Sequence, residues 1–320
     1  MSLAGQIALV TGASRGIGRG IALQLGQAGA TVYVTGRQPK NSDATKHDKY
    51  ELPSLEKTAR EINERGGKGI AVYCDHGDME NVKQLFEQID KENAGQLDIL
   101  VNNAYSAVTA IFDGTGQKFY EQAPEVWDEV NNVGLRNHYY CTVYAARMMV
   151  KRDKGLIVNI SSPGGLRYLF NIPYGVGKEA LDRMSADTAK ELKAKKVTVV
   201  SLWPGAVKTE LVTGMQKEDT SGRNAQVAKM FAEGETIEYP GLAVVHLAND
   251  PHRLNLTGFT LVTADLGDRY GFVDIDGRRP PNLRSVSRLL SYGGFTNLSG
   301  WVPDWVRLPG WYMWAANSRL

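Results

Sequence analysis

Three residues of the chain have the types and spacing of a proton-transfer site. Tyr174 and Lys178 are four positions apart in PYGVGK, and Ser162 lies twelve residues before the tyrosine in NISSPGG. Positions four apart share one face of a helix, so the phenol and the ammonium can reach the same place. A nearby positive charge favours the phenolate, and we therefore expect Lys178 to lower the pKa of Tyr174. Ser162 would hydrogen-bond the oxygen that gains or loses the proton.

A glycine-rich turn near the amino terminus gives this common spacing its significance. TGASRGIG follows a short apolar run and precedes a helical pattern, which places Gly12, Gly16 and Gly18 between a strand and a helix. The first glycine permits a tight turn, and the second lets the backbone approach a pyrophosphate. Free amide groups at the start of the helix favour an anion. This context predicts a dinucleotide site.

The charge at the end of the second apolar run indicates which dinucleotide. An acidic residue there would hydrogen-bond the adenosine ribose and repel a 2′-phosphate. The sequence instead has Gly36 followed by Arg37, and Arg15 adds a second cation in the first turn. Guanidinium groups suit a phosphate better than a hydroxyl. We therefore expect NADP(H) to be favoured over NAD(H).

Apolar runs alternate with helical patterns along most of the chain, which predicts an α/β fold with a doubly wound parallel sheet. We expect one domain of this Rossmann type over residues 1–265 and an aromatic-rich extension over 266–320. Polar residues follow each apolar run, and the carboxyl ends of parallel strands meet at one edge. Strands are predicted at 6–10, 31–36, 69–75, 97–103, 156–162 and 196–205, with helices at 78–94, 124–151 and 173–195.

Composition excludes several other classes of protein. The 320 residues carry a net charge of only +2, without the basic excess of a nucleic-acid-binding protein. Cys74 and Cys141 sit in apolar surroundings, which favours buried free thiols and a reducing compartment. The histidines lack the spacing of metal ligands, so no metal site is expected. Without a signal peptide or a long apolar span, we expect a location in the cytoplasm or on the cytosolic face of the endoplasmic reticulum, not secretion.

Over about residues 5–265 the chain resembles the short-chain dehydrogenase/reductase family, through TGASRGIG, NNAY, ISS, YGVGK and PGAVKT. The resemblance implies that Tyr174 is the general acid and base, that Lys178 binds the nicotinamide ribose, and that Ser162 holds the substrate oxygen. It also places Asp75 at the adenine and Asn103 on the adenosine side. The full set of cofactor contacts that we expect is Gly12, Ser14, Arg15, Gly16, Ile17, Gly18, Arg19, Arg37, Asp75, Asn103, Tyr174, Lys178, Pro204, Gly205, Val207 and Thr209.

Two positions depart from the family pattern. The family usually has an asparagine where this chain has Gly134, seven residues after Trp127, and its backbone carbonyl holds a water of the proton relay. Glycine keeps the carbonyl and tolerates a distorted helical turn. We expect Gly134 to preserve the relay, with Asn131 substituting in part; the alternative is that Asn131 only shapes the helix. Tyr105 replaces the usual glycine of NNAG.

The resemblance implies hydride transfer between nicotinamide and the carbonyl or alcohol carbon of a small lipophilic substrate, such as a steroid, a retinoid or a xenobiotic ketone or aldehyde. The alternative is a cofactor-binding sensor that has lost catalysis. A homo-oligomer, either dimer or tetramer, is expected through the helices after Trp127 and Tyr174. Besides Ser162, the substrate would meet Tyr105 and Tyr168, and the aromatic or apolar residues Phe112, Phe119, Tyr120, Phe170 and Met215 fall in the same loops.

The carboxyl-terminal extension is rich in tryptophan. Trp301, Trp305, Trp311 and Trp314 occur within fourteen residues. Three interpretations stay open: packing against a neighbouring subunit or the body of the domain, peripheral contact with a membrane interface, and a lid over the substrate pocket.

Overall fold

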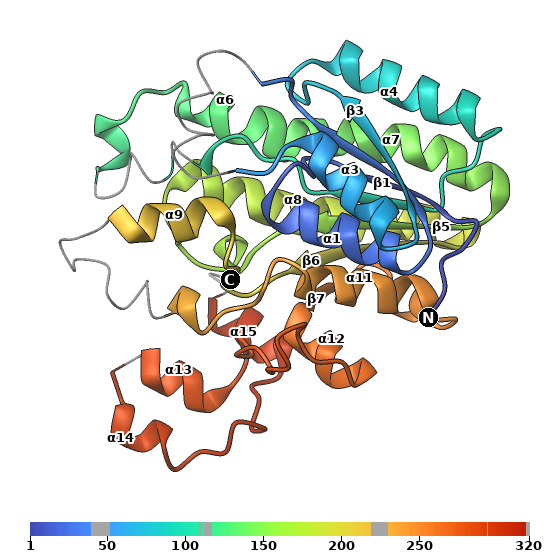
Figure 1. Ribbon diagram of the computed structural model, residues 1–320. Coiled ribbons are helices and arrows are strands. Elements are labelled where there is room, and N and C mark those ends of the chain that lie inside the picture. Colours follow the sequence, from blue (N-terminus) through green and yellow to red (C-terminus); the bar gives the residue numbers. More distant parts are fainter. Residues whose placement is uncertain (40–51, 109–110, 112–116, 219–229, 293, 318–320) are drawn as a thin grey trace.

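Short apolar segments form one sheet, as the sequence predicts. The computed structural model describes residues 1–39, 52–108, 111, 117–218, 230–292 and 294–317. Within these residues the sheet has seven parallel strands in the order β3-β2-β1-β4-β5-β6-β7 (Figure 1). The doubly wound parallel fold is thereby confirmed. The strands are β1 Ile7–Val10, β2 Thr31–Gly36, β3 Lys68–Tyr73, β4 Ile99–Asn102, β5 Gly155–Ile160, β6 Val197–Trp203 and β7 Thr260–Val262.

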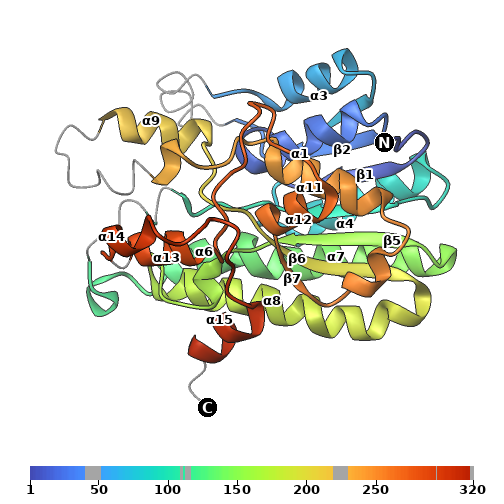
Figure 2. The same cartoon turned by 90° about the horizontal axis from the view of Figure 1, so that it is seen from below.

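Helices cover both faces of the sheet, which explains why the strands are apolar on both sides (Figure 2). In β1, Ala8 and Val10 belong to one buried cluster, whereas Leu9 between them belongs to the other. The first cluster includes α1 (Gly16–Gln27), α3 (Leu55–Glu64) and α11 (Tyr239–Asn249). The second includes α4 (Met79–Glu92), α7 (Asn137–Met149) and α8 (Ile172–Leu192).

The predicted helix over 124–151 is interrupted. It consists of α6 (Val126–Asn131), a π-helical turn (Asn132–Arg136), α7 and a short 3-10 turn (Val150–Arg152). The remaining helices are α9 Glu210–Glu218, α12 Thr263–Tyr270, α13 Val286–Tyr292, α14 Thr296–Ser299 and α15 Gly310–Asn317, with further 3-10 turns at Phe119–Glu121, Pro163–Gly165, Lys193–Lys195 and Arg253–Leu256.

The strand order reverses between β1 and β4, because the chain moves outward to β3 and then returns to the other side of β1. Ligands of open parallel sheets bind beside such a reversal, beyond the carboxyl ends of the strands. The glycine-rich turn, Ser162 and Pro204 directly follow the ends of β1, β5 and β6 or lie within two residues of them. The sheet therefore brings the chemically distinctive segments to one edge.

The carboxyl-terminal extension is tied to the rest of the fold by charged groups. Arg284 Nε lies 2.8 Å from Asp265 Oδ2, and Asn282 Nδ2 donates to Asp265 Oδ1 at 2.7 Å. Leu283 packs against Trp203 at the end of β6. The boundary predicted at residue 265 falls inside α12, so this division of the chain stays a prediction. In Figure 1, α13 and α14 lie at the border of the molecule below the sheet.

The tryptophans of the carboxyl-terminal extension whose side chains are described are largely exposed. Trp301, Trp305 and Trp311 have 87%, 77% and 71% of their surface exposed. Helices in the described part of the chain lack the combined length and apolar character needed to cross a membrane. Contact with a membrane interface and location at the endoplasmic reticulum stay predictions, and flotation of the protein with liposomes would test the contact.

Cys74 and Cys141 are buried free thiols, as expected. Burial raises the pKa of Cys74 to about 12, so this thiol stays protonated and unreactive at neutral pH. Within the described residues, no group of three or more His, Cys, Asp or Glu side chains is placed to hold a metal ion.

Candidate active site

Tyr174 and Lys178 lie one turn apart at the start of α8, where the local sequence fixes the helix. Asn171 has an extended backbone, and its Oδ1 accepts a hydrogen bond from the Tyr174 amide at 2.9 Å. Asparagine is a favoured capping residue, and Pro173 in the first turn is preorganised for a helix. The phenol and the ammonium therefore extend from a rigid helix start.

Ser162, rather than Ser161, reaches the tyrosine. The Tyr174 hydroxyl donates to Ser162 Oγ at 2.8 Å, and the Gly164 amide donates to the same oxygen at 2.9 Å. The Ser161 hydroxyl instead donates to the backbone carbonyl of Lys178 at 3.1 Å. The two serines point apart as expected, although β5 ends at Ile160 and both lie beyond it.

The ammonium of Lys178 is buried beside this pair, with 9% of the residue exposed. Its Nζ donates to the carbonyl of Ile160 at 3.0 Å and lies 5.8 Å from the centroid of the Tyr174 ring. Burial lowers the pKa of Lys178 to about 8, and the nearby carboxylate of Asp182 acts in the opposite direction. Lys178 therefore carries its charge at neutral pH and loses it as the pH rises above about 8.

The expectation of a lowered tyrosine pKa is wrong for this arrangement. Burial raises the pKa of Tyr174, and the hydrogen bond with Ser162 offsets the rise only in part. The Lys178 ammonium lies over the tyrosine ring and donates its hydrogen bond to the Ile160 carbonyl, so desolvation of the phenol outweighs any help from the charge. A phenol with a raised pKa keeps its proton at neutral pH, which suits proton donation.

The glycine-rich turn after β1 has the shape needed for a backbone-bound anion. Gly12 and Gly16 have φ values of 64° and 60°, a region that residues with a side chain rarely adopt. A Cβ at Gly12 would lie 2.7 Å from Ala104 Cα, and one at Gly18 would lie 2.3 Å from Asn103 Nδ2. Both approaches are closer than Cβ contacts allow, so the turn requires its glycines.

A carboxylate occupies the anion position at the start of α1. The Gly16 amide donates to Glu210 Oε2 at 2.9 Å, and Arg19 Nη1 lies 3.9 Å from Glu210 Oε1. A free amide, a helix N-terminus and a cation together favour an anion. Glu210 takes up these donors in this structure, and the same donors would suit the pyrophosphate of a dinucleotide, which stays a prediction.

The other residues predicted at this turn have different surroundings. Arg19 forms an ion pair with Glu61, so its charge is largely engaged within the protein. Arg15 is the residue that precedes α1, and Ile17 packs against the buried cluster on that face of the sheet. The Ser14 carbonyl accepts a hydrogen bond from α3, which joins the turn to that helix. Each of the four stays a predicted cofactor contact.

The ends of β2, β3 and β4 form the side of the site predicted for adenosine. β2 ends at Gly36, and the exposed Arg37 follows without an acidic residue at the strand end. Asp75 is exposed beyond β3. Asn103 beyond β4 braces the glycine-rich turn, because its Nδ2 donates to the Gly12 carbonyl at 3.0 Å. The structure therefore places these three predicted contacts, Arg37, Asp75 and Asn103, beyond the carboxyl ends of strands on one side of the sheet.

The segment after β6 is held from beneath by a buried acid. The Gly205 amide donates to Glu235 Oε1 at 2.8 Å, and Val207 forms a parallel bridge with Glu235. The Thr209 amide donates to the Val207 carbonyl at 2.8 Å, which closes the turn that begins at Pro204. Burial raises the pKa of Glu235 to about 8, so a neutral carboxyl supports this segment at neutral pH.

Comparison with known proteins gives the family. A family model described as short chain dehydrogenase matches residues 6–220. The chain belongs to the short-chain dehydrogenase family. A mouse relative, dehydrogenase/reductase SDR family member 1, is 49% identical over 321 residues, covering 99% of this chain and 98% of the relative. The resemblance drawn from the motifs is confirmed, and membership of this family of dehydrogenases and reductases makes the protein an oxidoreductase.

Two more distant similarities carry cofactor names. The NADPH-dependent aldehyde reductase 2 of Arabidopsis thaliana chloroplasts is 32% identical over 222 residues, covering 68% of this chain and 78% of the relative. A solved Agrobacterium tumefaciens structure with bound NADP has a TM-score of 0.65 and 26% identity, covering 82% of this chain and 95% of that one.

In this short-chain dehydrogenase Gly134 lies inside the π-helical turn, buried, where a distorted helix was expected. Asn131 Nδ2 donates to the carbonyl of Pro173 at 3.3 Å, and a Cβ at Gly177 would lie 2.2 Å from Asn131 Oδ1. Asn131 therefore joins α6 closely to the start of α8. Its part in the proton relay, and that of the Gly134 carbonyl, stay predictions.

Of the residues predicted to meet substrate in this short-chain dehydrogenase, some lie beside Tyr174, some are exposed and some lie outside the described residues. Tyr168 is 72% exposed on the loop between β5 and α8, and its hydroxyl donates a hydrogen bond to the Phe170 carbonyl at 3.1 Å. The Phe170 ring lies edge-on to the Tyr174 ring, with the ring centroids 5.1 Å apart. Phe119 and Tyr120 are 64% and 70% exposed. Phe112 lies outside the described residues, and so does the Met215 side chain.

Sequence reasoning missed three residues of the candidate site of this short-chain dehydrogenase: Asn171, Glu210 and Glu235. The asparagine carried a usable signal, since an asparagine followed within two residues by proline is typical of a helix start. Glu210 and Glu235 carried none, because each bonds a glycine amide far away in the sequence, 194 and 30 residues distant.

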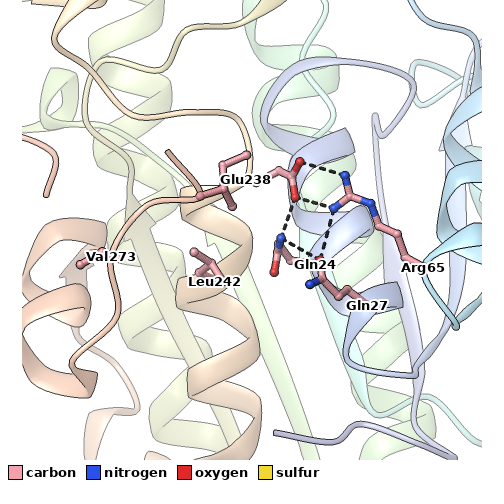
Figure 3. A pocket seen from close by; sticks show the side chains of 7 residues that line it. Gln24, Gln27, Arg65, Glu238, Leu242 and Val273 are labelled. Carbon is pink, nitrogen blue, oxygen red and sulfur yellow. Dashed lines mark hydrogen bonds and ion pairs between the residues drawn. The ribbon is translucent and has the colours of Figure 1, made fainter. Parts of the chain in front are cut away.

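A pocket that is lined by none of the predicted site residues lies along α1 of this short-chain dehydrogenase (Figure 3). Arg65 and Gln24 converge there on Glu238, at 2.6 Å in both cases. The carboxylate is thus fully paired and ties α1, α3 and α11 together. This arrangement is structural.

Proposed function

We propose that the protein is an NADP(H)-dependent carbonyl reductase that transfers a hydride between nicotinamide and the carbonyl or alcohol carbon of a lipophilic substrate. The observation that carries the proposal is the Tyr174 hydroxyl bonded to Ser162 at 2.8 Å, with the buried Lys178 ammonium beside it. Phe170 and Tyr168 on the adjacent loop favour an apolar substrate. A steroid, a retinoid or a xenobiotic ketone or aldehyde has this character.

NADP(H) is preferred to NAD(H) in this proposal for reasons of charge. Arg37 follows Gly36 at the end of β2, where NAD-binding sites place an acidic side chain. The Arabidopsis relative carries NADPH in its name, and the Agrobacterium structure contains NADP. Both similarities support the choice of cofactor.

Tyr174, Ser162 and Lys178 each have a separate part in the proposed reaction. The bound nicotinamide supplies the hydride. Tyr174 gives its proton to the carbonyl oxygen, and its raised pKa means that the proton is present at neutral pH. Ser162 Oγ, which has the Gly164 amide as donor, hydrogen-bonds the same substrate oxygen. The Lys178 charge favours the phenolate that remains after proton donation.

NADPH consumption over a panel of steroid, quinone and aldehyde carbonyls tests this function. Turnover of at least one lipophilic carbonyl is the expected outcome. The competing hypothesis is a cofactor-binding sensor that has lost catalysis, and it predicts NADPH binding without turnover of any member. Retention of Tyr174, Lys178 and Ser162 in bonding geometry favours the enzyme.

Changing Glu210 to glutamine is expected to tighten NADPH binding about 3- to 10-fold, because its carboxylate competes with phosphate for the Gly16 amide. Fluorescence titration of NADPH measures the dissociation constant. The exposed Glu191, changed to glutamine, serves as the control for loss of one negative charge. Equal affinities of the Glu210→Gln and Glu191→Gln proteins would contradict a phosphate at the start of α1.

A homo-oligomer stays part of the proposal. α7 and α8 expose Tyr139 and Val176, at 57% and 45%, on the helices predicted to pair. Light scattering coupled to gel filtration would distinguish a dimer or tetramer from a monomer.

A further inference from the structure

The ring of Tyr105 fills the space that a side chain at position 134 would need. A Cβ built on Gly134 would lie 2.8 Å from both Cδ2 and Cε2 of the Tyr105 ring. Such a contact is closer than real Cβ atoms make, so a side chain at position 134 requires the Tyr105 ring to shift. The two departures from the family pattern are therefore in direct contact.

The same ring contacts the buried ammonium of the active site. Lys178 Nζ lies 5.2 Å from the centroid of the Tyr105 ring and 5.8 Å from that of Tyr174. The two rings meet edge-to-face at 84°, with centroids 6.2 Å apart. The ammonium thus lies close to two aromatic rings and hydrogen-bonds the Ile160 carbonyl. A desolvated cation this close to a ring is attracted by the ring quadrupole.

Asp182 on the same helix offsets only part of the cost of burying Lys178. Burial raises the pKa of Asp182 to about 6, so it is ionised at neutral pH and raises the pKa of Lys178, but Ser201 and Trp203 also bond its carboxylate. Burial lowers the pKa of His138 on α7 to about 3, so this side chain is neutral. Tyr174 keeps its proton. The two rings add to the partial compensation that Asp182 gives.

The ring of Tyr105, not its hydroxyl, makes these contacts. The hydroxyl oxygen is buried and has no hydrogen-bond partner among the described residues. Burial also raises the pKa of this phenol, so it is not an acid or base at neutral pH. A phenylalanine would preserve every contact described above, whereas an aliphatic side chain would fill space without a quadrupole.

We propose that Tyr105 is a positioning residue that holds the Lys178 ammonium in the active site, and that Gly134 is required because it admits the Tyr105 ring. The proposal deepens the proposed function, on which it rests for its kinetic consequences. It differs from the expected substrate contact of Tyr105, because the ring acts on the substrate only through Lys178.

The first experiment follows the ammonium itself and needs neither substrate nor cofactor. Protein with ¹⁵N-labelled lysine is titrated by NMR, and the Lys178 signal is assigned from the Lys178→Met protein. The expected midpoint is near the pKa of about 8 in the parent and unchanged in Tyr105→Phe. In Tyr105→Leu the midpoint falls by about one pH unit, the size of a buried cation–π contact. Equal midpoints in Tyr105→Leu and the parent would overturn the positioning role.

The second experiment measures carbonyl reduction against pH for the same three proteins. In the parent and in Tyr105→Phe, kcat is expected to fall above about pH 8 as Lys178 loses its charge. Tyr105→Leu should show about tenfold lower kcat at pH 8 and an earlier fall. Absence of turnover in the parent would defeat the proposed function but leave the NMR result decisive for Tyr105. Melting temperatures confirm that each variant is folded.

The third experiment tests the shared space. Gly134→Asn is expected to lower the melting temperature, and Tyr105→Gly with Gly134→Asn should recover most of the loss by restoring the pair usual in the family. Gly300→Asn is the control, because Gly300 is exposed with a φ of −69° and a Cβ there would lie at an ordinary 3.8 Å from the Asn297 carbonyl oxygen. A Gly134→Asn protein as stable as the double variant would show that the two positions are independent.

Discussion

Changing Tyr174 to phenylalanine is expected to lower kcat for carbonyl reduction about 10³-fold while leaving the dissociation constant of NADPH nearly unchanged. The hydroxyl bonded to Ser162 is the proton donor in the proposed mechanism, and phenylalanine removes it alone. The ring keeps its contacts with Phe170 and Lys178. NADPH oxidation in the steady state gives kcat, and fluorescence titration gives the affinity.

The matched control is Tyr270→Phe. Tyr270 is the last residue of α12, and the change removes a hydroxyl that donates to Asp250 at 2.7 Å. It should leave kcat within about twofold, since general acid catalysis requires a group within hydrogen-bond reach of the substrate. Turnover by Tyr174→Phe close to that of the parent would refute the role of Tyr174. Loss of NADPH binding in that protein would indicate a structural defect instead.

Replacing Arg37 with aspartate is expected to shift the preference for NADPH over NADH by about 100-fold toward NADH. The change removes a charge-assisted hydrogen bond to the 2′-phosphate and places a negative charge where it repels that phosphate. Arg37 is exposed at the end of β2, so the substitution should leave folding intact. The ratio of kcat/KM for the two cofactors, with one carbonyl substrate, measures the effect.

Arg60→Asp provides the control for this charge reversal, because Arg60 is exposed on α3 and pairs only loosely with Glu64, at 3.7 Å. Its cofactor preference should equal that of the parent. An unchanged preference in Arg37→Asp would mean that Arg37 does not meet the 2′-phosphate, and the choice of NADP(H) would lose its main support.

The fold could be predicted from local patterns because each strand carries its own signal. β1 is apolar throughout and β6 is mostly apolar and fully buried, as central parallel strands are, and Gly12 and Gly16 after β1 have positive φ. The interruption of the helix over 124–151 had a partial signal in Gly134. The domain boundary predicted at residue 265 stays a prediction, because α12 continues through that residue.

The candidate site was predictable where residue types alone determine the chemistry, as for Tyr174 and Ser162. The direction of the tyrosine pKa was not, because it depends on how far burial outweighs charge at a place that only the fold creates. The contacts of Glu210 and Glu235 could not be predicted for a related reason. Each acts on a glycine amide brought near by the sheet edge, and sequence spacing does not encode such an approach.

The close approach of Gly134 and Tyr105 also couples the surface of one helix to the interior of the active site. A Cβ at position 134 would meet the Tyr105 ring at 2.8 Å, so any side chain there requires the ring to move. Because the same ring lies 5.2 Å from Lys178 Nζ, a substitution at position 134 should also change the surroundings of the buried ammonium.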